Sequence, residues 1–393
     1  GRFLNSHSIK STHKGAAMDL QKIKTYAQGI LDEIATGTAP QPLPEPVPEP
    51  VPTPVPTPTP IPVPPVVGGA VAKDVADIIA KAKAGGKVIV RKGAMGPLAL
   101  NGLKTAVTIE PEDPTDAASF SAITATGSSS VKMTGFKVIP TAGAAMGSNQ
   151  KYLIKTDAAS QGLVFEDMLI MGRDDADDFD NWTAADWQAW AWSGVQFLGG
   201  NNIARRCKLV GVNFGLSTLA PQNYFDDNTI FGYSGDGIRL NGDKCEAVRN
   251  RITDGVLINN NHPDAAQAFG KYNSATKTYA DLTGLVIEDN EFIEWTIRPS
   301  NPLRAKMQGI GGYNGRWVDA VVRKNRILSS SFTGMTLNNG VNATVTDNYF
   351  GHVDKVKADF PRVKVNGSGV TFERNQAPKF LMAVSASNTV AAF

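Results

Sequence analysis

The second half of the chain repeats one arrangement of apolar and polar positions. In "NYFDDNTIFG", "EAVRNRITDG", "LVIEDNEFIE" and "ATVTDNYFGH", a short apolar strand is followed by two polar residues, an asparagine and a second apolar strand. The asparagine position, called the pivot here, occurs in eight repeats, at Met168, Cys207, Asn228, Asn250, Asn290, Asn325, Asn348 and Asn375. The shorter separations between pivots define a unit of about 22 residues, and the longer ones fit one unit plus an insertion or nearly two units.

Short strands at this period, without helices between them, predict a parallel β-solenoid whose coils pair at about 4.8 Å. Asparagine suits the bend because it tolerates the left-handed backbone conformation and its amide can hydrogen-bond the asparagine of the next coil. We therefore expect a ladder of stacked asparagines. The alternative is an antiparallel sandwich, which regularly spaced two-residue hairpin turns would indicate, and the chain has none at regular spacing.

An amphipathic helix is predicted ahead of the repeats, in "AVAKDVADIIAKAKAGGKVIVRKG". Its apolar face is formed by Val71, Val75, Ile78, Ile79 and Ala82. Gly85 and Gly86 end the helix, and a short strand follows from Lys87 to Val90.

A proline-rich segment, residues 39–67, precedes this helix. Every even-numbered position from Pro40 to Pro64 is proline, which removes backbone donors and restricts the residue before it. The segment is therefore expected to form a polyproline II stalk spanning roughly 80 Å. An undirected linker, or a ligand for proline-binding modules, are the alternatives.

Residues 18–38 are predicted to form a helix for attachment or oligomerisation. Apolar residues recur at alternating steps of three and four, at Leu20, Ile23, Ala27, Ile30 and Ile34. Isoleucine at both kinds of seam position favours three or four strands over two, which includes a homotrimer. A helix that docks on another protein, such as a virion or surface attachment protein, is the alternative. Residues 1–17 are left as an unassigned tail.

Composition narrows the class of partner. The chain has 39 basic and 37 acidic residues, a net charge of +2, and no basic stripe suited to nucleic acid. No apolar run reaches the roughly 18 residues of a membrane span, so no membrane insertion is expected, and the opening "GRFLNSHSIKSTHKGAA" lacks the apolar centre of a signal peptide. The two cysteines, Cys207 and Cys245, have no zinc-type spacing and are expected to be buried thiols.

Taken together, the helix before "AGGKVIVRKG" and the coils with asparagine at a turn resemble the pectate-lyase-like, right-handed parallel β-helix superfamily over residues 68–380. The resemblance implies an all-β fold, a right-handed parallel β-helix domain spanning residues 68–393 with an N-terminal helix that caps the first coil. It does not specify an activity, because the fold hosts lyases, hydrolases, epimerases, adhesins and phage tailspikes.

Insertions between coils are the expected place for function. The first, residues 172–194, contains four tryptophans, of which Trp187 and Trp190 are candidates for stacking on sugar rings; packing within the protein is the alternative. The first part of the same insertion contains a run of five aspartates, at Asp174, Asp175, Asp177, Asp178 and Asp180. Carboxylates can bind Ca²⁺, but the ligand spacing of a hand-type loop is missing, so a solvated acidic loop with no metal or other cofactor is expected.

Two further insertions, beginning in "LINNNHPDAAQAFGKY" (257–272) and "EWTIRPSNPLRAKMQGIGGYNGRW" (294–317), are expected to form adjoining walls of one groove. The groove would bring together the candidate catalytic residues His262, Asp264, Arg298 and Asp236. The candidate substrate-binding residues there are Gln267, Lys271, Arg239, Trp295 and Arg304. An acid, a base and a cation in one cleft are what cleavage of an acidic polysaccharide requires.

The element "HPDAAQ" resembles an H-x-D-(A/G)-(I/V)-Q motif of β-helix proteins, including phage spikes and secreted uronan-modifying proteins. The resemblance implies a glycan site at His262, Asp264 and Gln267 without specifying a reaction. The chain departs from polygalacturonases, since "SGDG" has a single Asp236, and from pectate lyases, since proline directly follows Arg298 in "RPSNPLR". The alternative to a glycan site is a purely structural role, in which Asp264 and Gln267 hydrogen-bond a turn.

The order of attachment helix, stalk and solenoid favours a virion-associated spike or receptor-binding protein. This protein would recognise a host cell-surface polysaccharide and could also depolymerise it. Its location would be the virion or an extracellular surface. A secreted polysaccharide lyase or uronan epimerase is the first alternative, and a non-catalytic structural adhesin is the second.

Overall fold

The computed structural model describes residues 69–141, 151–259, 262–298, 300–356 and 359–390. Contacts divide the chain into two units, 1–62 and 63–393, and the described residues all belong to the second. The predicted tail (1–17), attachment helix (18–38) and proline-rich stalk (39–67) lie outside the described residues.

Three long sheets wind through the described residues, and each coil contributes a strand to each sheet in turn. The first sheet contains β1 (Ala70–Ala72), β2 (Gly86–Val90), β4 (Val107–Pro111), β7 (Val131–Thr134), β10 (Val164–Glu166), β13 (Ile203–Arg205), β16 (Tyr224–Asp226), β19 (Glu246–Val248), β25 (Val286–Glu288), β29 (Val321–Arg323), β32 (Thr344–Thr346) and β35 (Thr371–Glu373). The second contains β5 (Ser119–Phe120), β8 (Lys137–Val138), β11 (Leu169–Met171), β14 (Lys208–Val212), β17 (Thr229–Tyr233), β20 (Arg251–Gly255), β26 (Glu291–Ile293), β30 (Arg326–Leu328), β33 (Tyr349–Gly351), β36 (Gln376–Ala377) and β38 (Thr389–Val390).

The third sheet carries the site described below. It contains β3 (Pro97–Asn101), β6 (Ala122–Thr126), β9 (Tyr152–Thr156), β12 (Ser193–Phe197), β15 (Leu216–Thr218), β18 (Ile238–Leu240), β21 (Asp264–Gln267), β24 (Leu282–Thr283), β27 (Gln308–Gly312), β28 (Trp317–Val318), β31 (Thr333–Val341), β34 (Arg362–Ser368) and β37 (Lys379–Phe380). A separate antiparallel hairpin pairs β22 (Tyr272–Asn273) with β23 (Thr278–Tyr279). The short helices are α2 (Val75–Ala84), α3 (Ala184–Trp190), η1 (Pro114–Asp116) and η2 (Ala176–Asn181).

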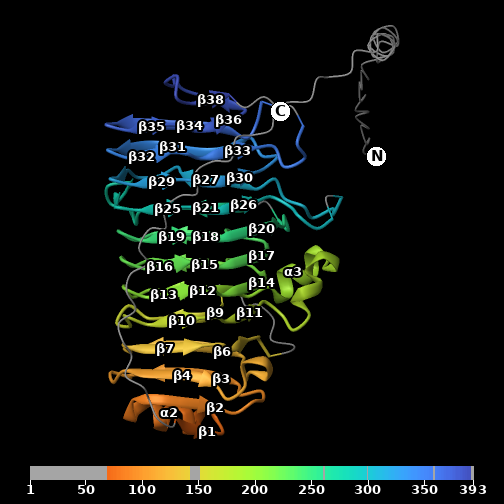
Figure 1. The fold of residues 1–393 in the computed structure, drawn as a ribbon, viewed down its shortest axis with the longest axis vertical. Helices are drawn as coiled ribbons and strands as arrows, with labels where there is room; N and C mark the ends of the chain where they lie inside the picture. Colours follow the sequence, from red (N-terminus) through yellow and green to blue (C-terminus); the bar gives the residue numbers. More distant parts are fainter. Residues whose placement is uncertain (1–68, 142–150, 260–261, 299, 357–358, 391–393) are drawn as a thin grey trace, which may run out of the picture. The chain divides into compact units, whose positions relative to one another are not determined.

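The predicted parallel solenoid is confirmed, and the antiparallel sandwich is wrong. In the first sheet Val164 pairs in parallel with Ile203, Ile203 with Tyr224 and Tyr224 with Glu246, one residue from each successive coil. Figure 1 shows the rungs stacked from β2 to β35. The rings of Phe165 and Phe225, from the first sheet, and of Phe197, from the third, stack inside the coil with centroids 6.0 and 5.6 Å apart.

The predicted asparagine ladder is also present. The amide nitrogen of Asn228 donates to Oδ1 of Asn250 at 2.9 Å, and the amide of Asn250 donates in the same way to Asn290 at 3.0 Å. Asn290, Asn325, Asn348 and Asn375 continue the ladder, each donating to the asparagine after it. These side chains are buried and also bond the backbone of neighbouring coils, so the ladder satisfies the polar groups of the turn.

The left-handed conformation falls one residue before the asparagine, which corrects the sequence expectation. These positive-φ residues are Asp167, Arg206, Asp227, Arg249, Asp289, Lys324, Asp347 and Arg374, with φ between 51° and 60°. Acidic and basic residues alternate along this series, and two of its neighbouring pairs are ion pairs, Arg206 with Asp167 at 2.9 Å and Arg374 with Asp347 at 2.6 Å. The turn thus uses asparagine for its inward hydrogen bonds and charged residues for its exposed corner.

The helix before the first coil is shorter than predicted. Asp74 caps α2, its side chain accepting a hydrogen bond from the Asp77 amide at 2.8 Å, and Gly85 ends it with φ of 80°. Val71 lies in β1 rather than on the helix, and it is exposed. Ile78 and Ala82 are fully buried against the first coil.

The described residues include no helix long and apolar enough to cross a membrane. Both cysteines are buried free thiols, as predicted, and burial raises the pKa of Cys207 to about 12 and that of Cys245 to about 11.

Candidate functional site

Three insertions leave the β-helix at the same corner, between a strand of the second sheet and a strand of the third. They are residues 172–192 between β11 and β12, 256–263 between β20 and β21, and 294–307 between β26 and β27. The last two contact each other directly: the Leu257 amide donates to the Leu303 carbonyl at 2.8 Å, and the Ala305 amide donates to the Gly255 carbonyl at 2.9 Å. Because the backbones of these two insertions are hydrogen-bonded together, they form a closed layer rather than the predicted open groove. We call the three insertions together the corner layer.

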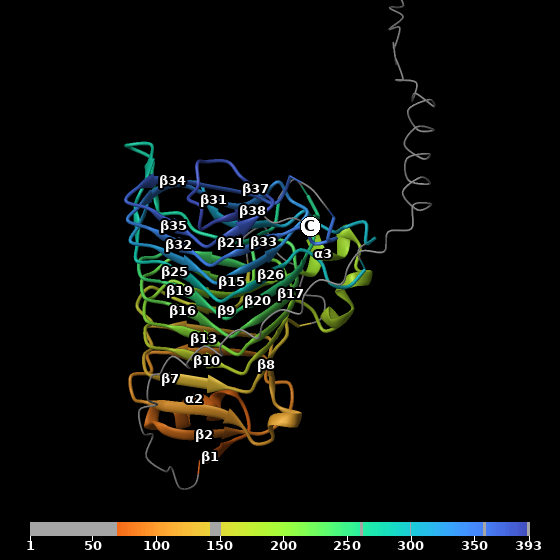
Figure 2. The same ribbon diagram turned by 45° about the horizontal axis from the view of Figure 1, so that its top comes forward.

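The tryptophans of these insertions form a packed cluster. Trp187 lies with its ring centroid 5.0 Å from that of Trp182 and 6.0 Å from that of Phe179, and Phe179 also contacts Trp295. Trp187 is fully buried and Trp295 is 4% exposed, so neither presents a ring face to a sugar. Packing is therefore the role that the structure gives to both. Trp190 ends α3, which Figures 1 and 2 place beside β17, and the environment of its side chain is outside the described part.

The predicted arginines hold the same layer in place. Arg298 pairs with Asp180 of the first insertion, which also accepts a hydrogen bond from the Asn301 amide at 2.8 Å. Arg304 pairs with the fully buried Glu294 at 2.7 Å and with Asp354 at 3.3 Å. The structure therefore gives Arg298 and Arg304 partners within the corner layer and does not bring them to Asp264. Pairing with a guanidinium satisfies the hydrogen-bonding capacity of a buried carboxylate.

Three further aspartates of the first insertion are also paired with protein groups. Asp175 lies 2.7 Å from Arg173, Asp178 accepts from Asn181 at 2.5 Å, and Asp177 lies 3.9 Å from Lys208. The described residues include no group of three or more His, Cys, Asp or Glu side chains placed to hold one metal ion.

The other predicted residues meet on the outer face of the third sheet. Ile238 of β18 pairs with Ala266 of β21, and Arg239 pairs with Gln267. The same register places Asp236 beside Asp264, whose backbone amide donates to Asp236 Oδ1 at 3.3 Å. We call Asp236, Arg239, His262, Asp264 and Gln267 the acid cluster. It brings together five of the residues predicted from the sequence.

Asp264 is the central side chain of the acid cluster. It is fully buried, its Oδ2 accepts a hydrogen bond from the Gln267 amide at 2.6 Å, and its Oδ1 has no hydrogen-bond partner. Nδ1 of His262 lies 3.5 Å from that Oδ1, and the His262 side chain is 58% exposed. Burial, and after it the charge of Asp236, raise the pKa of Asp264 to about 8 against the opposing effects of Arg239 and Gln267. A pKa in this range favours the protonated form of Asp264 at pH 7.

Asp236 has a cation as its partner. Nε of Arg239 donates to its carboxylate, and although burial raises the pKa of Asp236, this contact opposes the shift. The guanidinium of Arg239 in turn lies 4.1 Å from the Phe214 ring centroid and 6.0 Å from that of Phe269. With two carboxyl groups adjacent, the pair is expected to hold one proton near neutral pH, and Arg239 favours the ionised form of Asp236.

Tyrosines surround the acid cluster, and the sequence did not single them out. Tyr233 is fully buried with no hydrogen-bond partner for its hydroxyl, and burial together with the charges of Asp236 and Asp264 raises its pKa well above the usual value. Tyr313 donates to Gln308, the residue that pairs with Asp264 on the next strand. Its ring covers Gly311, where an added Cβ would lie 2.5 Å from Cε2 of Tyr313.

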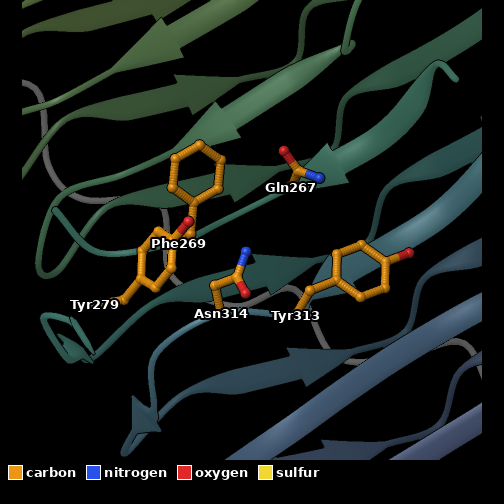
Figure 3. Close-up of a pocket in the computed structure, with 5 residues that line it drawn as sticks. All are labelled: Gln267, Phe269, Tyr279, Tyr313 and Asn314. Carbon is orange, nitrogen blue, oxygen red and sulfur yellow. The ribbon is translucent and has the colours of Figure 1, made fainter. Parts of the chain in front are cut away.

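A small pocket opens beside the acid cluster, at the end of β21 away from His262. It encloses about 90 Å³ and is lined by Gln267, Phe269, Tyr279, Tyr313 and Asn314 (Figure 3). Tyr279 comes from the β22–β23 hairpin, which begins just after Lys271. Lys271 is exposed on this hairpin side and thus follows the opposite end of β21 from His262.

Comparison with known proteins bears on the fold. No protein-family model and no curated protein matches the sequence. Among solved structures, the A-module of mannuronan C-5 epimerase AlgE6 from Azotobacter vinelandii matches with a TM-score of 0.50 at 10% identity, over 83% of this chain and 96% of that one. The chain is a right-handed parallel β-helix.

Two further structures match this β-helix with lower scores. An alginate lyase from Paenibacillus sp. str. FPU-7 gives a TM-score of 0.48 at 11% identity, over 81% of this chain and 98% of that one. The Dettilon tailspike protein gives 0.38 at 12% identity, over 76% of this chain and 57% of that one. Identities this low leave the activity to be argued from the site.

The acid cluster of the β-helix combines carboxyl groups, a guanidinium and an exposed imidazole. A neutral carboxylic acid can donate a hydrogen bond, an arginine can bind a carboxylate, and an exposed imidazole can accept a proton. Gln308, Tyr313, Phe269 and Tyr279 could be placed beside the cluster only once the register of the third sheet was known.

Proposed function

We propose that the outer face of the third sheet binds a surface polysaccharide that contains uronate residues, with the acid cluster at its centre. The observation that carries the proposal is Asp264, a fully buried carboxyl group with an unpartnered Oδ1 next to an exposed histidine. A buried oxygen without a partner is costly and needs an explanation: a bound hydroxyl would donate to it, and a bound carboxylate would accept from its protonated form.

A row of polar side chains runs along the third sheet through the acid cluster. Register aligns one outward position from each coil, at Lys155, Gln196, Ser217, Arg239, Gln267, Gly311, Thr336 and Lys364. Coils repeat at about 4.8 Å, which is close to the length of one pyranose residue in an extended polymer. An extended polysaccharide lying along the β-helix axis would thus meet a polar side chain at each of these coils except that of Gly311.

The direct test is isothermal titration calorimetry of the full chain with size-fractionated uronate-containing polysaccharides. Arg239→Gln and His262→Ala are expected to weaken binding at least tenfold, because the first removes the cation and the second an exposed donor. Asp174→Asn, an exposed aspartate of the corner layer, is the matched control. Equal affinity of all four proteins, or no binding of any polysaccharide on a broad panel, would contradict the proposal.

The finer version of this function is a spike displayed on a virion or an extracellular surface. It is supported by the order of predicted elements, in which an attachment helix (18–38) and a proline-rich stalk (39–67) precede the β-helix. Light scattering of the full chain and of a chain lacking residues 18–38 tests it. A homotrimer, or capture of an attachment protein, that is lost with the deletion is the expected result, and a monomer without a partner in both cases removes this version.

Chemistry on the bound uronate is a second candidate, favoured by the neutral acid next to an imidazole. Arg239 and protonated Asp264 would bind the sugar carboxylate and so acidify the hydrogen at C5, and His262 would remove that proton. In elimination, the C4–O4 bond then breaks, a C4–C5 double bond forms and O4 takes up a proton. In epimerisation, a proton returns to C5 from the opposite face.

These outcomes are distinguished with polymannuronate and polygalacturonate as substrates. Elimination produces ultraviolet absorbance from the unsaturated sugar, whereas epimerisation in deuterated water produces deuterium at C5 without a change in chain length. His262→Ala should abolish either signal. If the wild-type chain binds these polymers and neither signal develops, the site is one of recognition only.

A further inference from the structure

The pocket beside the acid cluster differs from it in chemistry. The five residues that line it are two amides and three aromatic residues, and none is charged. Phe269 and Tyr279 form one wall, with ring centroids 6.3 Å apart at an interplanar angle of 84°, and Tyr272 extends that wall with its ring centroid 5.0 Å from that of Tyr279. Figure 3 shows the Gln267 and Asn314 amides beside these rings.

We propose that this pocket is a subsite for an uncharged pyranose residue, next to the uronate held by the acid cluster. This inference rests on the proposed function and names the class of polymer: a heteropolysaccharide in which uronate and uncharged sugars adjoin, rather than a homopolymeric uronate. The two sites share Gln267, which lines the pocket and donates to Oδ2 of Asp264. A sugar in the pocket would therefore neighbour the one at the acid cluster.

The physical argument is complementarity of surface and charge. The C–H face of a pyranose ring can pack on the rings of Phe269 and Tyr279, and its hydroxyl groups can hydrogen-bond the two amides. A carboxylate entering the same pocket would lose its hydration without gaining a cation, because the pocket lining supplies none. The volume of about 90 Å³ accommodates part of one ring and not a longer segment.

The β22–β23 hairpin determines this subsite. It supplies Tyr279 from outside the coil, and it is the antiparallel pair that stands apart from the three sheets. A hairpin that adds an aromatic wall to an otherwise polar row changes which sugar fits without altering the acid cluster. Substitutions at Tyr279 are therefore expected to change specificity, and substitutions at Arg239 to change binding of every uronate-containing ligand.

The test uses an array of purified bacterial surface heteropolysaccharides together with polymannuronate, polygalacturonate and hyaluronan fragments. The full chain is expected to bind polymers with alternating uronate and uncharged sugars at least tenfold more tightly than the two homopolymeric uronates. Tyr279→Ala should remove that preference, Tyr279→Phe should retain it because the ring remains, and Ser274→Ala at the exposed hairpin turn is the matched control. Circular dichroism of each variant confirms the β-helix.

The outcomes separate this inference from the function on which it rests. If the homopolymers bind as tightly as the heteropolymers, or if Tyr279→Ala binds like Ser274→Ala, the subsite is overturned. If Arg239→Gln still weakens binding in that case, the proposed function stands. If the wild-type chain binds nothing on the array, both are overturned.

Discussion

Replacing Asp264 by asparagine is expected to flatten part of the pH dependence of stability. Asp264 has a pKa of about 8 in the folded protein, raised by burial and then by Asp236, against a reference value of 3.8. Between these two values the folded chain binds a proton at Asp264 that the unfolded chain has released. The free energy of unfolding therefore falls as pH rises through this window, and the contribution levels off above about pH 8.

The expected slope follows from linkage. One proton bound only by the folded state changes the free energy of unfolding by about 1.36 kcal/mol per pH unit. Between pH 5 and pH 7, wild-type chain should therefore lose about 2.7 kcal/mol more than Asp264→Asn, whose side chain does not titrate. Asparagine retains a carbonyl for the hydrogen bond from Gln267 and places an amide toward His262, so it resembles the neutral acid.

Urea unfolding followed by tryptophan fluorescence at pH 5, 6, 7 and 8 measures this difference. The informative quantity is wild type minus variant at each pH, because titrating groups distant from Asp264 cancel in it and only Asp236, its coupled neighbour, titrates differently in the variant. Asp174→Asn controls for the loss of one aspartate at an exposed position. Parallel curves for wild type and Asp264→Asn from pH 5 to pH 8 would show that Asp264 is ionised in the folded protein and would refute the reasoning.

Two further substitutions test the framework around the site. Asn290→Ala removes the side chain that accepts from the Asn250 amide at 2.8 Å and donates to the Ala247 carbonyl at 2.9 Å. Because these buried groups are then unpaired, the free energy of unfolding measured in urea titrations should fall by about 3 kcal/mol. A loss below about 0.5 kcal/mol would contradict the ladder's role. Trp187→Ala should lower the free energy of unfolding by about 3–5 kcal/mol because the indole is fully buried. The Kd for the glycan, measured by calorimetry, should not change. A raised Kd at unchanged stability would mean that the indole contacts the glycan.

The coil could be predicted from the sequence because one corner of it carries a chemical signature. The pivot asparagines recur at one turn only, where the buried amide ladder makes asparagine necessary, and so Asn228 and Asn250 identify the repeat. Another corner carries a shorter series, in which the Asn202 backbone amide donates to Asn223 Oδ1 at 2.8 Å. The pattern also misplaced the left-handed residue, since both Asp227 and Asn228 are polar and only the backbone distinguishes them.

The candidate site was predicted in part, and the division has a physical cause. Asp236, Arg239, Asp264 and Gln267 lie on or next to strands, so the coil repeat alone brings them together. Trp187 and the other corner-layer residues lie on insertions, whose side chains are placed by packing and ion pairing that no repeat encodes. Charged and aromatic residues that looked like ligands for a sugar proved to be partners for one another.

Burial of two adjacent carboxyl groups on the outer face of a sheet calls for a reason other than folding. On the next coil, the position that pairs with Asp264 is occupied by Gln308, a neutral side chain that needs no charge compensation. Asp264 instead raises the free energy of the folded state at neutral pH and leaves one oxygen without a partner. A glutamine there would stabilise the same turn at less cost. Such a cost at a position next to an exposed imidazole is typical of sites kept for binding or chemistry, which is why Asp264, more than the motif around it, supports a glycan site.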